Sequence, residues 1–62
     1  MKQELMTVAE VAKLLRLSKR TIQRLVQRKE LVGYTFHGVY RIPREAVVIY
    51  MEKALAREAT LF

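Results

Sequence analysis

The 62-residue chain is short and strongly basic, with 12 Lys and Arg residues against 6 Asp and Glu residues and a net charge of +6. Because it contains no cysteine and 52% of its residues are hydrophobic, we expect a single domain over residues 1–62 with an aliphatic core. No apolar run approaches the roughly 20 residues of a membrane span and the N-terminal residues lack a signal-like apolar stretch, so we expect a cytoplasmic protein without membrane contact.

The chain is poorly equipped for catalysis or metal binding. Ser18 and His37 are its only serine and histidine, and it has no Asp or Cys to complete a nucleophilic triad. Its Glu residues are scattered, and none stands at metal-ligand spacing from His37. We therefore predict a protein that is not an enzyme and binds no metal or cofactor. The excess of positive charge favours a polyanionic partner.

A capping box marks the start of the first predicted helix. The Thr7 hydroxyl can accept a hydrogen bond from the Glu10 amide, while the Glu10 carboxylate accepts one from the Thr7 amide. Apolar or small residues then recur with helical spacing at positions 8, 11, 12 and 15. This pattern predicts a helix over residues 8–15 and leaves residues 1–6 as a lead-in of undefined structure.

A second helix is predicted over residues 19–29, with Ser18 as its N-cap. At about 100° per residue, Ile22, Leu25 and Val26 share one side of this helix. The opposite side is polar and basic and carries Arg20, Gln23, Arg24, Gln27 and Arg28. Like charges four residues apart destabilise an isolated helix by about 0.2–0.5 kcal/mol per pair, so an unmixed basic side indicates a polyanionic partner.

The two predicted helices and their short connection have the pattern of a helix-turn-helix, in which the helices cross at about 90–120°. Ala12 is small enough to let the two backbones approach, and Leu17 is expected to fill the turn. The angle between the helices is then filled by Val11, Leu15, Ile22 and Leu25. Units of this kind read DNA by placing the second helix in the major groove.

Residues 31–42 are predicted to form a β-hairpin. Both arms are rich in β-branched and aromatic residues, and His37-Gly38 between them suits a tight two-residue turn. Pro43 suits the opening of a third helix, predicted over residues 44–59. The core stripe of that helix is expected to be Val47, Met51, Ala54 and Leu55.

An unbroken apolar run over residues 46–51 sweeps more than a full helical turn, so one side of the third helix cannot bury all of it. We expect Val48 and Ile49 to face solvent, close to a C-terminus that ends in Leu61 and Phe62. We predict either that Leu61 and Phe62 fold back over this patch or that the patch contacts a second subunit on DNA.

The order and spacing of these segments resemble the excisionase-type, MerR-like DNA-binding domains of bacteria and phages. The motifs that carry the resemblance are Met6–Leu15, Ser18–Ile22 and Tyr40–Ala46. The resemblance implies a mainly α-helical winged helix-turn-helix with a small β-hairpin, whose second helix enters the major groove. Its hairpin, the wing, would touch the DNA backbone or minor groove. The chain departs from the family where Arg16 replaces a frequent Gly, Gln23 a frequent Tyr, and Val39 a frequent Arg or Lys.

Carried over by position, the resemblance implies that the second helix faces DNA through Ser18, Lys19, Arg20, Thr21, Gln23 and Arg24. It assigns the wing to His37, Gly38, Val39 and Arg41. The residue types themselves indicate phosphate contacts for Lys19 and Arg20, with hydroxyl donors from Ser18 and Thr21. Arg pairs with guanine and Gln with adenine in the major groove, so the expected base readers are Gln23, Arg24 and Gln27. Arg28 is expected to contact the DNA backbone.

The leading functional hypothesis is a sequence-specific binder of double-stranded DNA, most simply an excisionase-like recombination factor that acts with an integrase. A small transcription regulator of a mobile element or phage is the nearest alternative. A protein-interaction adaptor of the antitoxin or packaging type could use the same fold. Stacking of single-stranded bases on Tyr34, Phe36 and Tyr40 is a further alternative. We expect instead that the core needs these aromatic residues.

Overall fold

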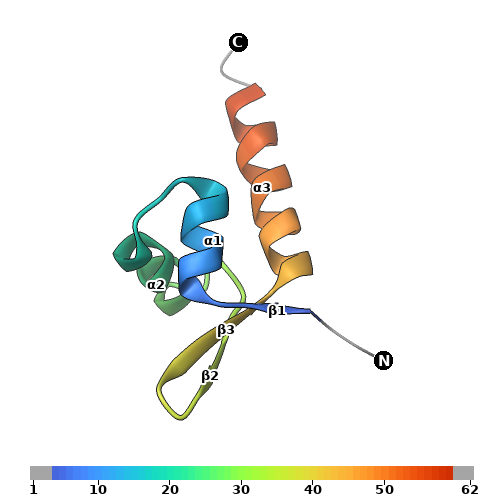
Figure 1. Cartoon of the computed structure of the whole chain (residues 1–62). Coiled ribbons are helices and arrows are strands. Elements are labelled where there is room, and N and C mark those ends of the chain that lie inside the picture. Colours follow the sequence, from blue (N-terminus) through green and yellow to red (C-terminus); the bar gives the residue numbers. More distant parts are fainter. Residues whose placement is uncertain (1–3, 60–62) are drawn as a thin grey trace.

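The computed structural model describes residues 4–59 and contains three helices and three short strands (Figure 1). In chain order the elements are β1 (Leu5–Met6), α1 (Val8–Leu15), α2 (Lys19–Gln27), β2 (Tyr34–Phe36), β3 (Val39–Pro43) and α3 (Arg44–Ala59). The helix-turn-helix, the hairpin and the third helix follow one another as predicted. The fold class, a mainly helical winged helix-turn-helix, is thereby confirmed.

Hydrogen-bonded caps begin the first two helices at the predicted positions. The Thr7 amide donates to Glu10 Oε1 at 2.9 Å and the Glu10 amide donates to Thr7 Oγ1 at 3.1 Å, which completes the capping box of α1. At the start of α2, Ser18 Oγ accepts from the Thr21 amide at 3.1 Å. α2 ends at Gln27, earlier than the predicted residue 29, because the chain turns through a left-handed position just beyond it.

The turn between α1 and α2 depends on Arg16, which adopts the left-handed conformation with φ 59° and ψ 42°. This conformation closes the turn without a glycine, because the Leu17 amide then donates to the Ala12 carbonyl oxygen at 2.9 Å. The prediction that Leu17 fills the turn is wrong, since its side chain is 41% exposed. The helices approach closely enough for Ala12 and Ile22 to fill the crossing themselves.

The three strands form an antiparallel sheet in the order β1-β3-β2. At the end of the hairpin Phe36 pairs with Val39 across the turn residues His37 and Gly38. Both turn residues have positive φ, 50° and 78°, as tight hairpin turns require. The hairpin is confirmed, but its first strand begins at Tyr34 and is therefore shorter than predicted.

Residues 5 and 6 form a strand, so the prediction of an undefined lead-in over residues 1–6 is wrong for them. They pair with Pro43 and Ile42 of β3, and the Arg44 amide donates to the Glu4 carbonyl oxygen at 3.0 Å. Two residues are too few to carry a periodic signal. The strand forms because residues 5 and 6 lie along the edge of β3 and pair with its backbone. Pro43, which pairs with Leu5, is the last residue of β3, and α3 begins at the next residue, Arg44.

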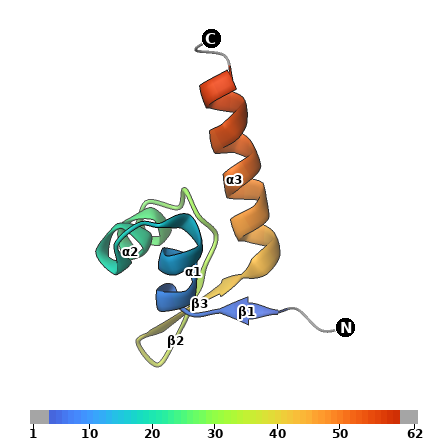
Figure 2. The ribbon, with the colours of Figure 1, turned by 45° about the horizontal axis from the view of Figure 1, so that its top comes forward.

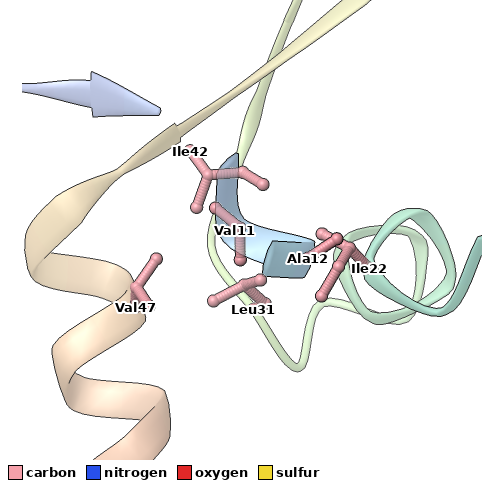
Figure 3. Close-up of a cluster of buried hydrophobic side chains, with 6 residues drawn as sticks. All are labelled: Val11, Ala12, Ile22, Leu31, Ile42 and Val47. Atoms are coloured by element: carbon pink, nitrogen blue, oxygen red, sulfur yellow. The ribbon is translucent and has the colours of Figure 1, made fainter. Parts of the chain in front are cut away.

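One cluster of six buried side chains joins the elements (Figure 3). Its members come from α1, α2, β3, α3 and the segment after α2, and they are Val11, Ala12, Ile22, Leu31, Ile42 and Val47. Partly buried hydrophobic residues pack around this cluster: Met6, Val8, Leu15, Leu25, Val26, Ala46 and Tyr50. The expected helix-turn-helix core is therefore extended by one residue each from the segment after α2, from β3 and from α3.

α3 contributes less to the core than predicted. Val47 is 1% exposed, but Met51 and Leu55 are 36% and 65% exposed, and Ala54 is exposed as well. The helix has 16 residues and is about 24 Å long, so its second half extends beyond the rest of the molecule (Figure 2). Within residues 4–59, neither α3 nor any other helix combines the length and apolarity needed to cross a membrane.

The left-handed turn generates a prediction about stability. A left-handed residue with a Cβ costs about 1–2 kcal/mol relative to its right-handed form, whereas glycine avoids this cost. Arg16→Gly is therefore expected to raise the free energy of unfolding by about 0.5–1 kcal/mol, after the greater freedom of glycine in the unfolded chain is subtracted. Thermal denaturation measures this change. Arg16→Ala removes the same charge but retains the strain, and stabilisation of both variants would contradict the backbone explanation.

Candidate nucleic-acid interface

α2 turns one side toward the core and the other toward solvent. Ile22 is fully buried, while Leu25 and Val26 are half-buried and pack against the core cluster. The exposed residues of this helix and its C-cap are polar or basic: Lys19, Arg20, Gln23, Arg24, Gln27 and Arg28. The structure thus brings the predicted α2 site residues, apart from half-buried Thr21, onto one exposed surface.

Among the side chains that the structure describes, none that is acidic forms an ion pair with the basic residues of α2. In the part of the chain that the structure describes, the ion pair between Arg44 and Glu4, at 3.7 Å, joins the first residue of α3 to the residue before β1 and lies outside α2. The first turn of α2 contains no acidic residue but begins with Lys19 and Arg20. These cations stand at the positive end of the helix dipole, where an anion is favoured. The surface therefore has a positive potential that attracts anions.

The hydroxyl groups at the start of α2 serve the helix itself. Ser18 Oγ accepts from the Thr21 amide and lies 2.8 Å from Thr21 Oγ1, so the two hydroxyls share one hydrogen bond. One hydroxyl hydrogen of the pair is left over for an outside acceptor. The capping role predicted for Ser18 is therefore observed, and a contact to an anion would be added to it.

A cleft of about 370 Å³ lies between the start of α1, the start of α2 and the hairpin. No acidic side chain lines it, and its lining residues are Thr7, Val8, Ala9, Lys19, Gln23, Gly38, Val39, Tyr40 and Arg41. It thus brings together Lys19 and Gln23 of α2 with Arg41 of the hairpin, which are distant in sequence. Arg24, Arg28 and His37 lie outside this lining.

A hydrogen bond holds the hairpin against α2. Gln27 Nε2 donates to Tyr40 Oη at 3.2 Å. Gln27 was predicted to read bases and Tyr40 to pack in the core, where it is half-buried. The connection was not visible in the sequence, because it joins residues 13 positions apart that belong to different elements. Tyr40 is accordingly a positioning residue that sequence analysis missed.

Two of the four predicted wing residues, His37 and Arg41, occupy different environments. His37 is exposed in the hairpin turn. Arg41 is partly buried, and its Nη1 donates to the Tyr40 carbonyl oxygen at 3.0 Å. Part of the donor capacity of Arg41 is therefore used within its own strand, and the residue also lines the cleft.

Two helices that cross through a short turn, followed by a hairpin beside the second helix, define a winged helix-turn-helix of the DNA-binding class. The chain matches the family model described as a helix-turn-helix domain over residues 5–54. It therefore belongs to this excisionase-like family. No curated protein and no solved structure matches the chain. The absence of catalytic activity stays a prediction.

Proposed function

We propose that the chain binds double-stranded DNA sequence-specifically, with α2 in the major groove and the hairpin against the adjoining backbone. The single observation that carries this proposal is the exposed basic side of α2, which has no acidic partner among the described side chains and adjoins a cleft without acidic lining. A solvated helix surface usually mixes charges of both signs, which lowers its self-repulsion. A surface that instead gathers cations and amides on one side suits phosphates and base edges.

The positions along α2 suggest a division of roles. Lys19 and Arg20 stand in the first turn, where helix amides also favour phosphate, so we assign them to the DNA backbone with support from Ser18 and Thr21. Gln23 and Arg24 occupy the middle of the exposed side and are assigned to base edges. Arg28, at the end of the helix, is assigned to the backbone, as are His37 and Arg41 of the wing.

Gln27 requires a modified assignment. Its amide nitrogen donates one hydrogen to Tyr40, which leaves a second hydrogen and the carbonyl oxygen for the N7 and N6 atoms of an adenine. The tyrosine also fixes the amide plane before DNA arrives. Gln27 would then read its base from a fixed orientation at a smaller cost in side-chain entropy.

Within this class we favour an excisionase-like recombination factor that works with an integrase. The support is the family match together with the resemblance of the three motifs. A transcription regulator of a mobile element needs the same kind of DNA-binding surface. Genetic experiments are therefore needed to distinguish the two roles. Dependence of excision on the protein in the presence of integrase supports the first, and repression from its own promoter supports the second.

Selection of bound sequences from a random duplex library at about 150 mM salt tests the proposed function, because non-specific phosphate binding weakens as salt rises. We expect one short motif to be enriched. Failure to enrich any motif, together with tight binding to a protein partner, would favour an adaptor and overturn sequence-specific DNA recognition.

The phosphate assignment predicts a change in salt dependence. Lys19→Ala is expected to weaken binding to the selected site and to random duplex by the same factor. It should lower the slope of log affinity against log salt by about one, since one fewer counterion is released. Titrations at several salt concentrations measure both effects. Lys53→Ala on α3 removes the same charge outside α2 and should leave the slope nearly unchanged.

The base-reading assignment predicts a selective loss. Arg24→Ala is expected to cost about 1–3 kcal/mol on the selected site and much less on random duplex, because a bidentate contact to guanine is lost. Repeating the selection with the variant should relax the preference at one position. Equal weakening on both duplexes would contradict a reading role and make Arg24 a phosphate contact.

We also propose that neighbouring copies touch one another on DNA through α3. Val48 and Ile49 are 44% and 46% exposed, in agreement with the expectation from sequence. The related expectation for Leu61 and Phe62 lies outside the described residues. A net charge of +6 opposes contact between free copies, but DNA phosphates neutralise it and hold two copies at high local concentration.

Binding isotherms on DNA with one site and with two adjacent sites test this contact. The wild-type protein is expected to bind two sites cooperatively, and Ile49→Glu should abolish cooperativity without changing affinity for a single site, because a carboxylate would have to be buried. Leu14→Glu introduces the same charge at a side chain that is 54% exposed on α1 and serves as the control. Equal cooperativity in wild type and Ile49→Glu would contradict contact through α3.

A further inference from the structure

The end of the hairpin is apolar and uncharged, although the chain as a whole is strongly basic. Between Tyr34 and Tyr40 the sequence contains no Lys, Arg, Asp or Glu. Phe36 and Val39 form the last cross-strand pair beside the two-residue turn, and their side chains are 52% and 46% exposed. We call residues 36–39 the wing tip. It extends away from the helices at the far end of the hairpin (Figure 1), and apart from the imidazole of His37 its side chains have no group with which to hold a phosphate.

The position of the wing tip on DNA follows from the cleft, and this step rests on the proposed function. With α2 in the major groove, the cleft between Lys19 and Gln23 on one side and Val39 and Arg41 on the other receives a phosphate strand. The two grooves of a duplex alternate across each phosphate strand. The wing tip, on the far side of that strand, therefore meets the minor groove.

We propose that Phe36 inserts into the minor groove as an apolar wedge between two base pairs and bends the duplex. Two hydrogen-bonded strands lie about 4.8 Å apart before their side chains are added, whereas the minor groove is only about 6 Å wide. A hairpin can therefore enter only where the groove opens. Apolar side chains that unstack a base step open this groove and bend DNA toward the major groove. An exposed phenyl ring beside an uncharged turn has the chemistry that this requires.

The structure also holds the ring in advance, as a wedge requires. The Tyr34 ring lies on the same strand with its centroid 6.3 Å from that of Phe36, at an interplanar angle of 47°. The turn is fixed by positive φ angles at His37 and Gly38. The Gln27–Tyr40 hydrogen bond ties the hairpin to α2, so the helix and the wedge keep their spacing.

The test uses the full chain on its selected duplex site. The bend is measured by energy transfer between dyes at the two DNA ends. Unstacking is measured by the fluorescence of 2-aminopurine placed at successive positions on the wing side of the site. We expect a bend of about 20° or more and a fluorescence increase at a single step. Phe36→Thr, which keeps a strand-forming residue, should lose both signals and about tenfold in affinity.

Two further variants separate the wedge from general effects. Phe36→Leu retains a large apolar side chain and should retain most of the bend. Val32→Ala shortens an apolar side chain that is 58% exposed and lies before β2, and it should leave the unstacked step in place. Thermal denaturation of each variant checks folding, and Phe36→Thr is expected to melt near the wild-type temperature, since more than half of the side chain is exposed.

The outcomes distinguish the wedge from the proposed function. If the wild-type protein selects a duplex site but leaves it straight and fully stacked, the wedge is overturned and sequence-specific binding stands. An unchanged bend in Phe36→Thr also overturns it. If no duplex is selected and a single-stranded oligonucleotide binds more tightly, both proposals fall and the exposed rings stack on unpaired bases instead.

Discussion

Ile42 has no exposed surface, and its place in the middle of the sheet ties the two halves of the molecule together. Its strand pairs with β1 on one edge and with β2 on the other, and it runs directly into α3. A shift of this strand by one residue would bring a neighbour such as Arg41 into the core and expose Ile42. The register is therefore fixed by burial, and with it the place of the hairpin beside α2.

The close approach of Gly33 to Val26 and Ile42 sets the distance between the hairpin and α2. A Cβ on Gly33 would lie 3.0 Å from Val26 Cγ1 and 3.4 Å from Ile42 Cγ1. Glycine is required here for close approach and not for an unusual φ, and it lets the chain pass tightly from α2 into β2. Together with the Gln27–Tyr40 hydrogen bond, this contact makes α2 and the hairpin one preorganised unit, which lowers the entropy cost of binding a rigid ligand.

Local signals predicted the parts of the fold that local chemistry determines. The capping box at Thr7, the cap at Ser18 and the two sides of α2 were correct because each depends on neighbours within one helical turn. The strand at residues 5–6 and the Gln27–Tyr40 brace could not be predicted, because each needs a partner supplied by distant chain. The stripe assigned to α3 had the right period, but periodicity does not say how far the neighbouring layer extends. The candidate site was likewise predicted only in part. Its basic residues could be identified from the sequence, but the cleft could not, because it lies between distant segments.

The basic surface that we propose binds DNA works against the stability of the free domain. A single small core rarely supplies more than about 3–5 kcal/mol in a chain shorter than about 70 residues, and here the core is one cluster of six side chains. A net charge of +6 adds self-repulsion within the folded chain, while the second half of α3 keeps Leu55 and Met51 at least partly exposed. A polyanion relieves the repulsion, and any ligand that binds only the folded chain adds its own free energy to the stability. Binding of DNA to the basic surface would thus offset the self-repulsion that this surface causes in the isolated domain.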